Sequence, residues 1–118
     1  VLAFFEIPNS PPMGRDTNTP EWVQHIAFKV GSEQDLVDAK ARLEAAGISV
    51  VGITDHTIFK SIYFFDPNGH RLELVCDIGT PDMYKKLDDV KWAMLDEWSR
   101  TKRAPKHAQW MHEAELAR

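Results

Sequence analysis

The sequence predicts an α+β domain in which a strand, a helix and three more strands follow one another, with further helices after them. Residues 22–30, 61–65 and 71–76 alternate apolar and polar side chains with the period of two that is typical of half-buried strands. Residues 32–46 carry the cap and the spacing of a helix, and the Asp-Pro-Asn-Gly of residues 66–69 is a hairpin signal. The length of 118 residues suits one hydrophobic core.

The first elements are a strand and a long loop. Residues 1–7 are apolar and aromatic and end at Pro8, which predicts a strand. Residues 8–21 are rich in Pro, Asn, Ser, Gly, Asp and Thr, so we expect a loop that links two substructures. The strand of residues 22–30 follows, and Gly31 ends it.

A helix and a strand come next. Ser32 and Asp35 resemble a capping box, and Gly47 supplies the stop. Between them the apolar side chains recur at helical spacing, at Leu36, Ala39, Leu43 and Ala46. The β-branched residues 48–53 then predict a strand, followed by the hairpin of residues 61–65 and 71–76.

The C-terminal part is predicted to be helical. Thr80 followed by Pro81 marks a helix start. An apolar stripe then runs through Met83, Leu87, Val90, Met94 and Trp98. After a break at residues 103–105, a second short helical stretch carries Trp110 and Met111. We expect these helices to dock on the sheet or on a partner, since such a stripe is most often part of a core.

Composition excludes several classes of function. The 18 acidic and 14 basic side chains give a net charge of −4, which argues against a nucleic-acid partner. No run approaches the ~18 apolar residues that a membrane-spanning helix needs. Cys76 is the sole cysteine and no secretory leader is recognisable, so we expect a cytoplasmic protein.

Three of the predicted strands each have one apolar face and one face that carries a side chain able to bind a metal or transfer a proton. The apolar face is expected to pack under the helix of residues 33–46, and the opposite face presents His25, Tyr63 and Glu73. Imidazole and carboxylate are ligands of borderline divalent metals, and a phenol beside them can donate a proton. The alternatives are a surface histidine, a solvated glutamate and an ordinary cross-strand tyrosine.

The segments WVQHIAFKV and DHTIFKSIYFFDPNGHRLEL resemble the second βαβββ module of the vicinal oxygen chelate superfamily. That superfamily includes glyoxalases, fosfomycin and bleomycin resistance proteins and extradiol ring-cleaving dioxygenases. The resemblance implies a curved mixed sheet with one packing helix, in paired modules around a metal-holding cleft. It assigns residues 1–78 to this domain and residues 79–118 to a helical extension. Residues 1–7 would be the last strand of a first module, 8–21 the linker and 22–78 the second module.

The resemblance also assigns roles to four residues. His25 and Glu73 fall on the metal-ligand positions of the second module. Tyr63 matches a tyrosine beside the metal in the ring-cleaving branch, and His56 lies where an acid/base histidine is often found, although a loop histidine is more often merely exposed.

The match departs from the family in its metal ligands. The remaining ligand belongs to the first strand of a first module, which this sequence lacks, so we expect either a truncated chain with poor activity or a partner that completes the site. When residues 2–6 are aligned with residues 71–75, Phe4 falls opposite Glu73. Only a slip of two residues in this alignment would bring Glu6 to the metal. Two histidines and one carboxylate suit Fe(II), with Mn, Zn or Ni as other options.

The resemblance therefore favours a metal-dependent, dioxygenase-like oxidoreductase. Its substrate would be a small molecule that chelates the metal through vicinal oxygens, and the protein would be a homodimer, because one module cannot close a cleft alone. Two alternatives remain open: a glyoxalase-type lyase or isomerase, and a metal-free module that binds an antibiotic or another small molecule.

Overall fold

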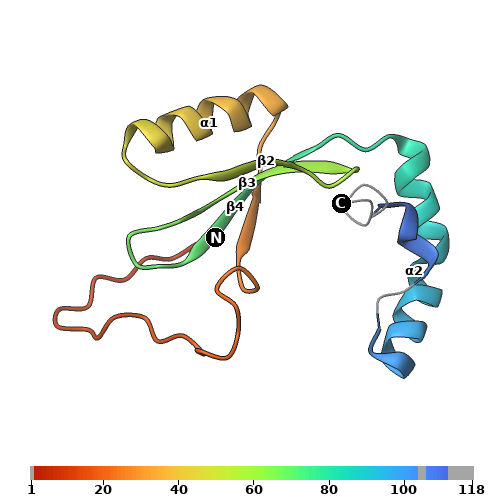
Figure 1. Ribbon diagram of the computed structural model, residues 1–118, viewed down its shortest axis with the longest axis horizontal. Helices are drawn as coiled ribbons and strands as arrows, with labels where there is room; N and C mark the ends of the chain where they lie inside the picture. The colour runs from red at the N-terminus through yellow and green to blue at the C-terminus, as the bar shows by residue number, and fades with distance from the viewer. Residues whose placement is uncertain (1, 104–105, 112–118) are drawn as a thin grey trace.

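A computed structural model describes residues 2–103 and 106–111 of the chain (Figure 1). The elements in chain order are β1 (Ile26–Lys29), α1 (Glu33–Ala45), β2 (Val51–Asp55), β3 (Phe59–Phe65), β4 (Arg71–Asp77), α2 (Pro81–Thr101) and the 3₁₀ helix η1 (Lys106–Met111).

The four strands form one mixed sheet in the order β1-β4-β3-β2. β1 and β4 run parallel, with α1 and the two other strands between them in the sequence, whereas β2 with β3 and β3 with β4 pair antiparallel. The predicted α+β class, with a mixed sheet, one packing helix and helices after it, is confirmed.

Local side-chain chemistry sets the ends of the elements. The Ser32 hydroxyl accepts the Asp35 N–H at 3.2 Å and so caps α1. In the hairpin turn, the Asp66 carboxylate accepts the N–H groups of Asn68 at 2.9 Å and of His70 at 2.8 Å. These hydrogen bonds replace partners that the backbone N–H groups lose where an element ends.

The core lies between α1 and one face of the sheet. Leu36 and Ala39 of α1 are buried against Ile62 of β3 and Cys76 of β4. Half-buried side chains surround them, at Val30, Leu43, Val50 and Leu74. Figure 1 shows α1 along one side of the sheet and α2 beyond its end. The prediction that one apolar face packs under this helix is therefore confirmed.

Residues 2–7 form no strand, so the strand predicted for residues 1–7 is wrong over the part that the structure describes. Phe4 is 88% and Phe5 is 83% exposed. An apolar strand is stable only with a hydrogen-bonding neighbour and an apolar surface over it, and residues 2–7 pair with neither edge strand of the sheet.

Two strands begin later than the sequence suggested. The Val23 N–H bonds to the Pro20 carbonyl at 3.0 Å in a turn, so β1 starts at Ile26 and not at residue 22. The Ile48 N–H bonds to the Leu43 carbonyl at 2.9 Å, which keeps residue 48 at the helix end, and β2 starts at Val51. In both cases a local hydrogen bond competes with the sheet for the backbone.

α2 is anchored beside the turn between β2 and β3. The Tyr84 hydroxyl donates to the Ile58 carbonyl at 3.2 Å, and the Thr57 hydroxyl donates to the Met111 carbonyl of η1 at 3.0 Å. The predicted stripe is half-buried over its first four members, whereas Trp98 is 48% exposed. The helix therefore docks by its start and by η1, and no described residue of α2 is fully buried.

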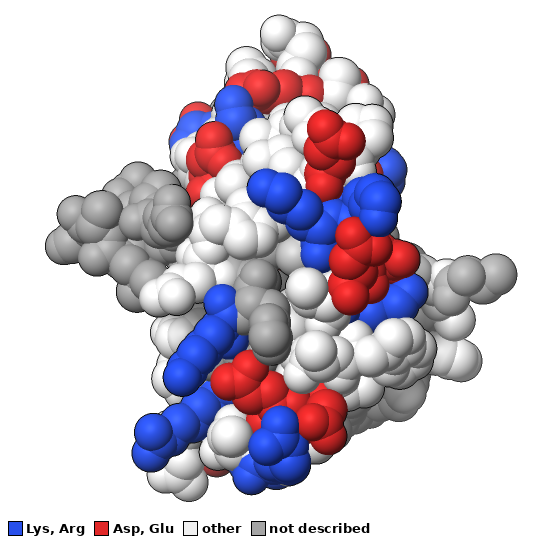
Figure 2. Space-filling view, turned by 90° about the vertical axis from the view of Figure 1, so that its right-hand side faces the viewer, with Lys and Arg blue, Asp and Glu red and all other residues white. Residues whose placement is uncertain are grey.

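The side of the molecule that carries α2 has charges of both signs (Figure 2). Lys85 pairs with Asp89 at 2.7 Å and Arg100 with Asp96 at 3.0 Å along the helix. These exposed pairs solvate the outer face of α2 and contribute little stability. No helix in the described ranges has the length and apolar content to cross a bilayer.

Candidate metal and substrate site

His25 and Glu73 meet on the sheet face opposite α1. β1 and β4 pair in parallel with Ala27 beside Glu73, which brings the residue just before β1 to the same place. The distance from His25 Nε2 to Glu73 Oε2 is 3.0 Å. The Glu73 side chain is 6% exposed and that of His25 is 31% exposed, so the carboxylate is buried and the imidazole borders solvent.

Ser61 holds the other oxygen of the Glu73 carboxylate. Its hydroxyl, which is completely buried on β3, donates a short hydrogen bond to Glu73 Oε1. Both oxygens of the buried carboxylate therefore have a partner, and the plane of the carboxylate is fixed. Ser61 was not among the residues predicted from the sequence; the available signal was a hydroxyl two residues before Tyr63, on the same face of the strand.

Tyr63 stands directly beside Glu73 in the pairing of β3 with β4. Its ring lies edge-on to the His25 ring, with centroids 5.7 Å apart. Burial, and then the nearby Glu73 carboxylate, raise the pKa of Tyr63 above its ordinary value. The phenol is therefore protonated at neutral pH, and its hydroxyl can donate a hydrogen bond.

His56 completes the group from the turn between β2 and β3. Its backbone N–H bonds to the Phe59 carbonyl at 2.9 Å, and its ring lies tilted against the Phe59 ring with centroids 4.8 Å apart. These contacts aim Nε2 at the Tyr63 hydroxyl, 2.8 Å away. The structure thus brings together all four side chains that the sequence analysis selected.

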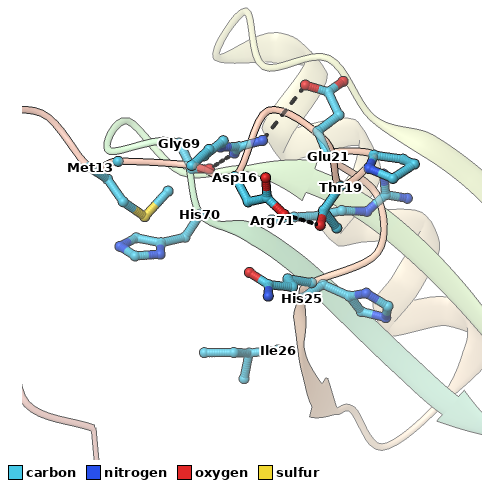
Figure 3. Close-up of a pocket in the computed structure, with 13 residues that line it drawn as sticks. Met13, Asp16, Thr19, Glu21, His25, Ile26, Gly69, His70 and Arg71 are labelled. Atoms are coloured by element: carbon cyan, nitrogen blue, oxygen red, sulfur yellow. Dashed lines mark hydrogen bonds and ion pairs between the residues drawn. The ribbon is translucent and has the colours of Figure 1, made fainter.

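A pocket of about 270 Å³ opens in front of His25 (Figure 3). The loop of residues 13–24 forms one wall, and residues 69–71 at the hairpin form another. Arg15 ties the two together, since it donates to the Gly69 carbonyl and forms an ion pair with Glu21 at 3.7 Å. The loop that was expected only to link two substructures therefore builds the wall of the pocket.

The His25–Glu73 pair fits two positions of a metal site. Two ligand atoms about 2.1 Å from one ion and at right angles to each other lie about 3 Å apart. Among the described residues, no three His, Cys, Asp or Glu side chains are grouped so that they would hold an ion. His70 lines the same pocket but does not join the pair. The described chain thus presents two candidate ligands.

The known proteins that are similar to this chain match only part of its length. A Bacillus subtilis (strain 168) protein named "Putative ring-cleaving dioxygenase MhqA" is 38% identical over 55 residues, which are 47% of this chain and 17% of that protein. The integron cassette protein HFX_CASS4, from the mobile metagenome of the Halifax Harbour sewage outfall, is 38% identical, with a TM-score of 0.42 over 45% of this chain and 47% of that one. FosX, the fosfomycin resistance protein of Listeria monocytogenes, is 29% identical, with a TM-score of 0.42 over 51% of this chain and 49% of that one. The chain therefore spans under a fifth of the curated relative and about half of each solved structure.

The match to a family model is broader. It covers residues 1–74, from the N-terminal segment through most of β4, and it includes His25, Tyr63 and Glu73. This range is more than half of the 118 residues. The chain belongs to the Glyoxalase/Bleomycin resistance protein/Dioxygenase superfamily, as the sequence motifs predicted.

Proposed function

We propose that this chain is one module of a metal-dependent, dioxygenase-like enzyme that acts on a small molecule with vicinal oxygens. The observation that carries the proposal is the meeting of two pairs on one sheet face: His25 with Glu73 at 3.0 Å, and Tyr63 with His56 at 2.8 Å. The name of the Bacillus subtilis relative, a ring-cleaving dioxygenase, supports this branch. Superfamily members generally bind divalent metals, which supports a metal site in this chain.

His25 Nε2 and Glu73 Oε2 would hold the ion, with Fe(II) as the preferred metal and Mn, Zn or Ni as alternatives. A third ligand would come from a preceding module of a longer chain or from a second subunit of a homodimer. When bound, such an ion orients two vicinal oxygens of a substrate and stabilises the negative charge that develops on them.

Tyr63 and His56 would carry out the proton transfer of the reaction. The Tyr63 phenol, whose pKa is raised, is protonated at neutral pH as a free tyrosine is, and its hydroxyl would donate to an oxygen of the substrate. His56 Nε2, at 2.8 Å, is within range to pass a proton to or from that hydroxyl. The described chain therefore contributes both a binding pair and a proton-transfer pair.

Ser61→Ala should weaken binding of the metal by roughly 10–100-fold, as loss of a partner that orients a ligand typically does. The substitution removes the hydroxyl that bonds Glu73 Oε1 and leaves that buried oxygen without a donor. Metal affinity is measured by competition with a chromophoric chelator. Ser99→Ala, on the exposed surface of α2, is the matched control and should leave the affinity unchanged. An unchanged affinity in Ser61→Ala would show that the hydrogen bond plays no part in metal binding.

Oxygen consumption tests the proposed reaction. The protein is loaded with Fe(II) without oxygen, mixed with catechol and then exposed to oxygen. The proposal predicts uptake of one O₂ per substrate and a ring-opened product that contains both oxygen atoms. Retained metal without uptake for any catechol would contradict it. Ligand binding that survives His25→Ala, without turnover, would instead favour the metal-free binding module.

A further inference from the structure

Arg71 lies at the edge of the pocket, and no described carboxylate forms an ion pair with its positive charge. It is the first residue of β4, and its guanidinium carbon lies 4.7 Å above the centre of the Tyr63 ring and 5.9 Å from that of Phe65. Its Nε is buried and has no hydrogen-bond partner among the described residues. A buried donor without a partner costs free energy, and a group of this kind in a folded protein calls for an explanation, such as a ligand that it binds.

The carboxylates near Arg71 are already engaged. Glu21 pairs with Arg15 at 3.7 Å, and Asp16 accepts hydrogen bonds from its own loop. Glu73 is held by His25 and by a hydroxyl on β3. None of the described carboxylates forms an ion pair with Arg71, which lines the pocket together with His25.

Packing of Arg71 beside two aromatic rings favours one kind of ligand. These contacts restrict the position of the guanidinium, and its planar fork of N–H donors matches a carboxylate. Figure 3 shows Arg71 and His25 lining the same pocket. A ligand in this pocket would therefore reach both residues.

We propose that Arg71 binds an anionic group of the substrate, in the simplest case a carboxylate. The substrate would then be a small molecule with vicinal oxygens at one end and an anionic group at the other. The vicinal oxygens rest on the function proposed above, whereas the anion site rests on Arg71 alone.

The binding of two ligands to the wild-type protein and to one variant tests whether Arg71 binds the anionic group. The ligands are 3,4-dihydroxybenzoate and catechol, which share the diol and differ in the carboxylate. The variant Arg71→Gln keeps a long polar side chain and removes the charge. Binding to the Fe(II)-loaded protein is measured by calorimetry without oxygen. Arg100→Gln, on the exposed face of α2, removes the same charge far from the pocket and should change neither affinity.

Arg71→Gln should weaken dihydroxybenzoate by roughly 10–100-fold, as expected for loss of a charge-assisted pair, and catechol by less than about 3-fold. Equal weakening of both ligands, or of neither, would overturn the proposal. If Arg71→Gln does not fold by circular dichroism, Arg71→Lys replaces it. That variant keeps the charge but loses the flat fork, and it should weaken dihydroxybenzoate alone by several-fold.

Binding of benzoate to the metal-free protein separates the two proposals. If the protein retains no metal and catechol does not bind, the proposed function fails. Arg71 still binds anions if benzoate binds and Arg71→Gln abolishes that binding. Benzoate affinity equal in wild type and variant, or no benzoate binding at all, would overturn the role of Arg71 as well.

Discussion

Replacing Glu73 by glutamine should remove the metal ion from the protein and leave the fold intact. Glutamine has nearly the same shape but no negative charge, and its amide is a poor replacement for the carboxylate that faces His25 at 3.0 Å. The loss of affinity should exceed the roughly 10–100-fold that removal of a supporting hydrogen bond causes. Elemental mass spectrometry after anaerobic loading with Fe(II) measures the metal, and thermal unfolding checks the fold.

Two controls make the Glu73 experiment specific. Glu44→Gln removes an acidic side chain of α1 that pairs with Lys40 at 3.4 Å, and it should leave the metal content unchanged. His70→Ala removes a histidine that lines the same pocket without joining the ligand pair. Metal content that falls in His70→Ala but not in Glu73→Gln would contradict the assignment of the ligands.

Replacing Tyr63 by phenylalanine should lower kcat by about 10²–10⁴-fold, the usual contribution of a positioned acid or base. Phenylalanine keeps the ring between His25 and Arg71 and removes only the hydroxyl that bonds His56. Metal content and KM should change little. Steady-state oxygen uptake measures the effect.

The partner of Tyr63 provides the control. His56→Gln should also lower kcat, and the double variant should lose no more than Tyr63→Phe alone, because residues that act as a unit are not additive. Because the pKa of Tyr63 is raised, its proton-donating form persists to more alkaline pH than that of a free tyrosine. An unchanged kcat in Tyr63→Phe would exclude the proton-transfer role.

Most of the module could be predicted because its sequence signals are local. The hydroxyl of Ser32, the carboxylate of Asp66 and the Thr80-Pro81 pair act within four residues of themselves. The period-two pattern placed Tyr63 and Glu73 on one face, and the strand pairing sets them side by side.

What could not be predicted depends on contacts distant in sequence. In the sequence, Ser61 has the pattern of an ordinary strand residue. Its role follows only from the pairing of β3 with β4, which brings Glu73 to it. In the sequence, Arg71 has the pattern of a solvated charge. The structure places its guanidinium beside the rings of Tyr63 and Phe65. The wall built by Arg15 needs a contact across 54 residues, which no local pattern encodes.

The strand predicted for residues 1–7 failed for a related reason. Apolar and β-prone composition gives the segment a preference for extended backbone, but pairing depends on a neighbouring edge. Phe4 and Phe5 are instead exposed to solvent. A local preference alone does not assemble a sheet.

Anomalous diffraction from crystals soaked in Fe(II) without oxygen tests the central claim most directly. We predict one peak on the sheet face opposite α1, about 2.1 Å from both His25 Nε2 and Glu73 Oε2. The remaining ligand should be visible beside it, from a preceding module or from a second subunit. Iron bound elsewhere, or no iron between His25 Nε2 and Glu73 Oε2, would contradict the account.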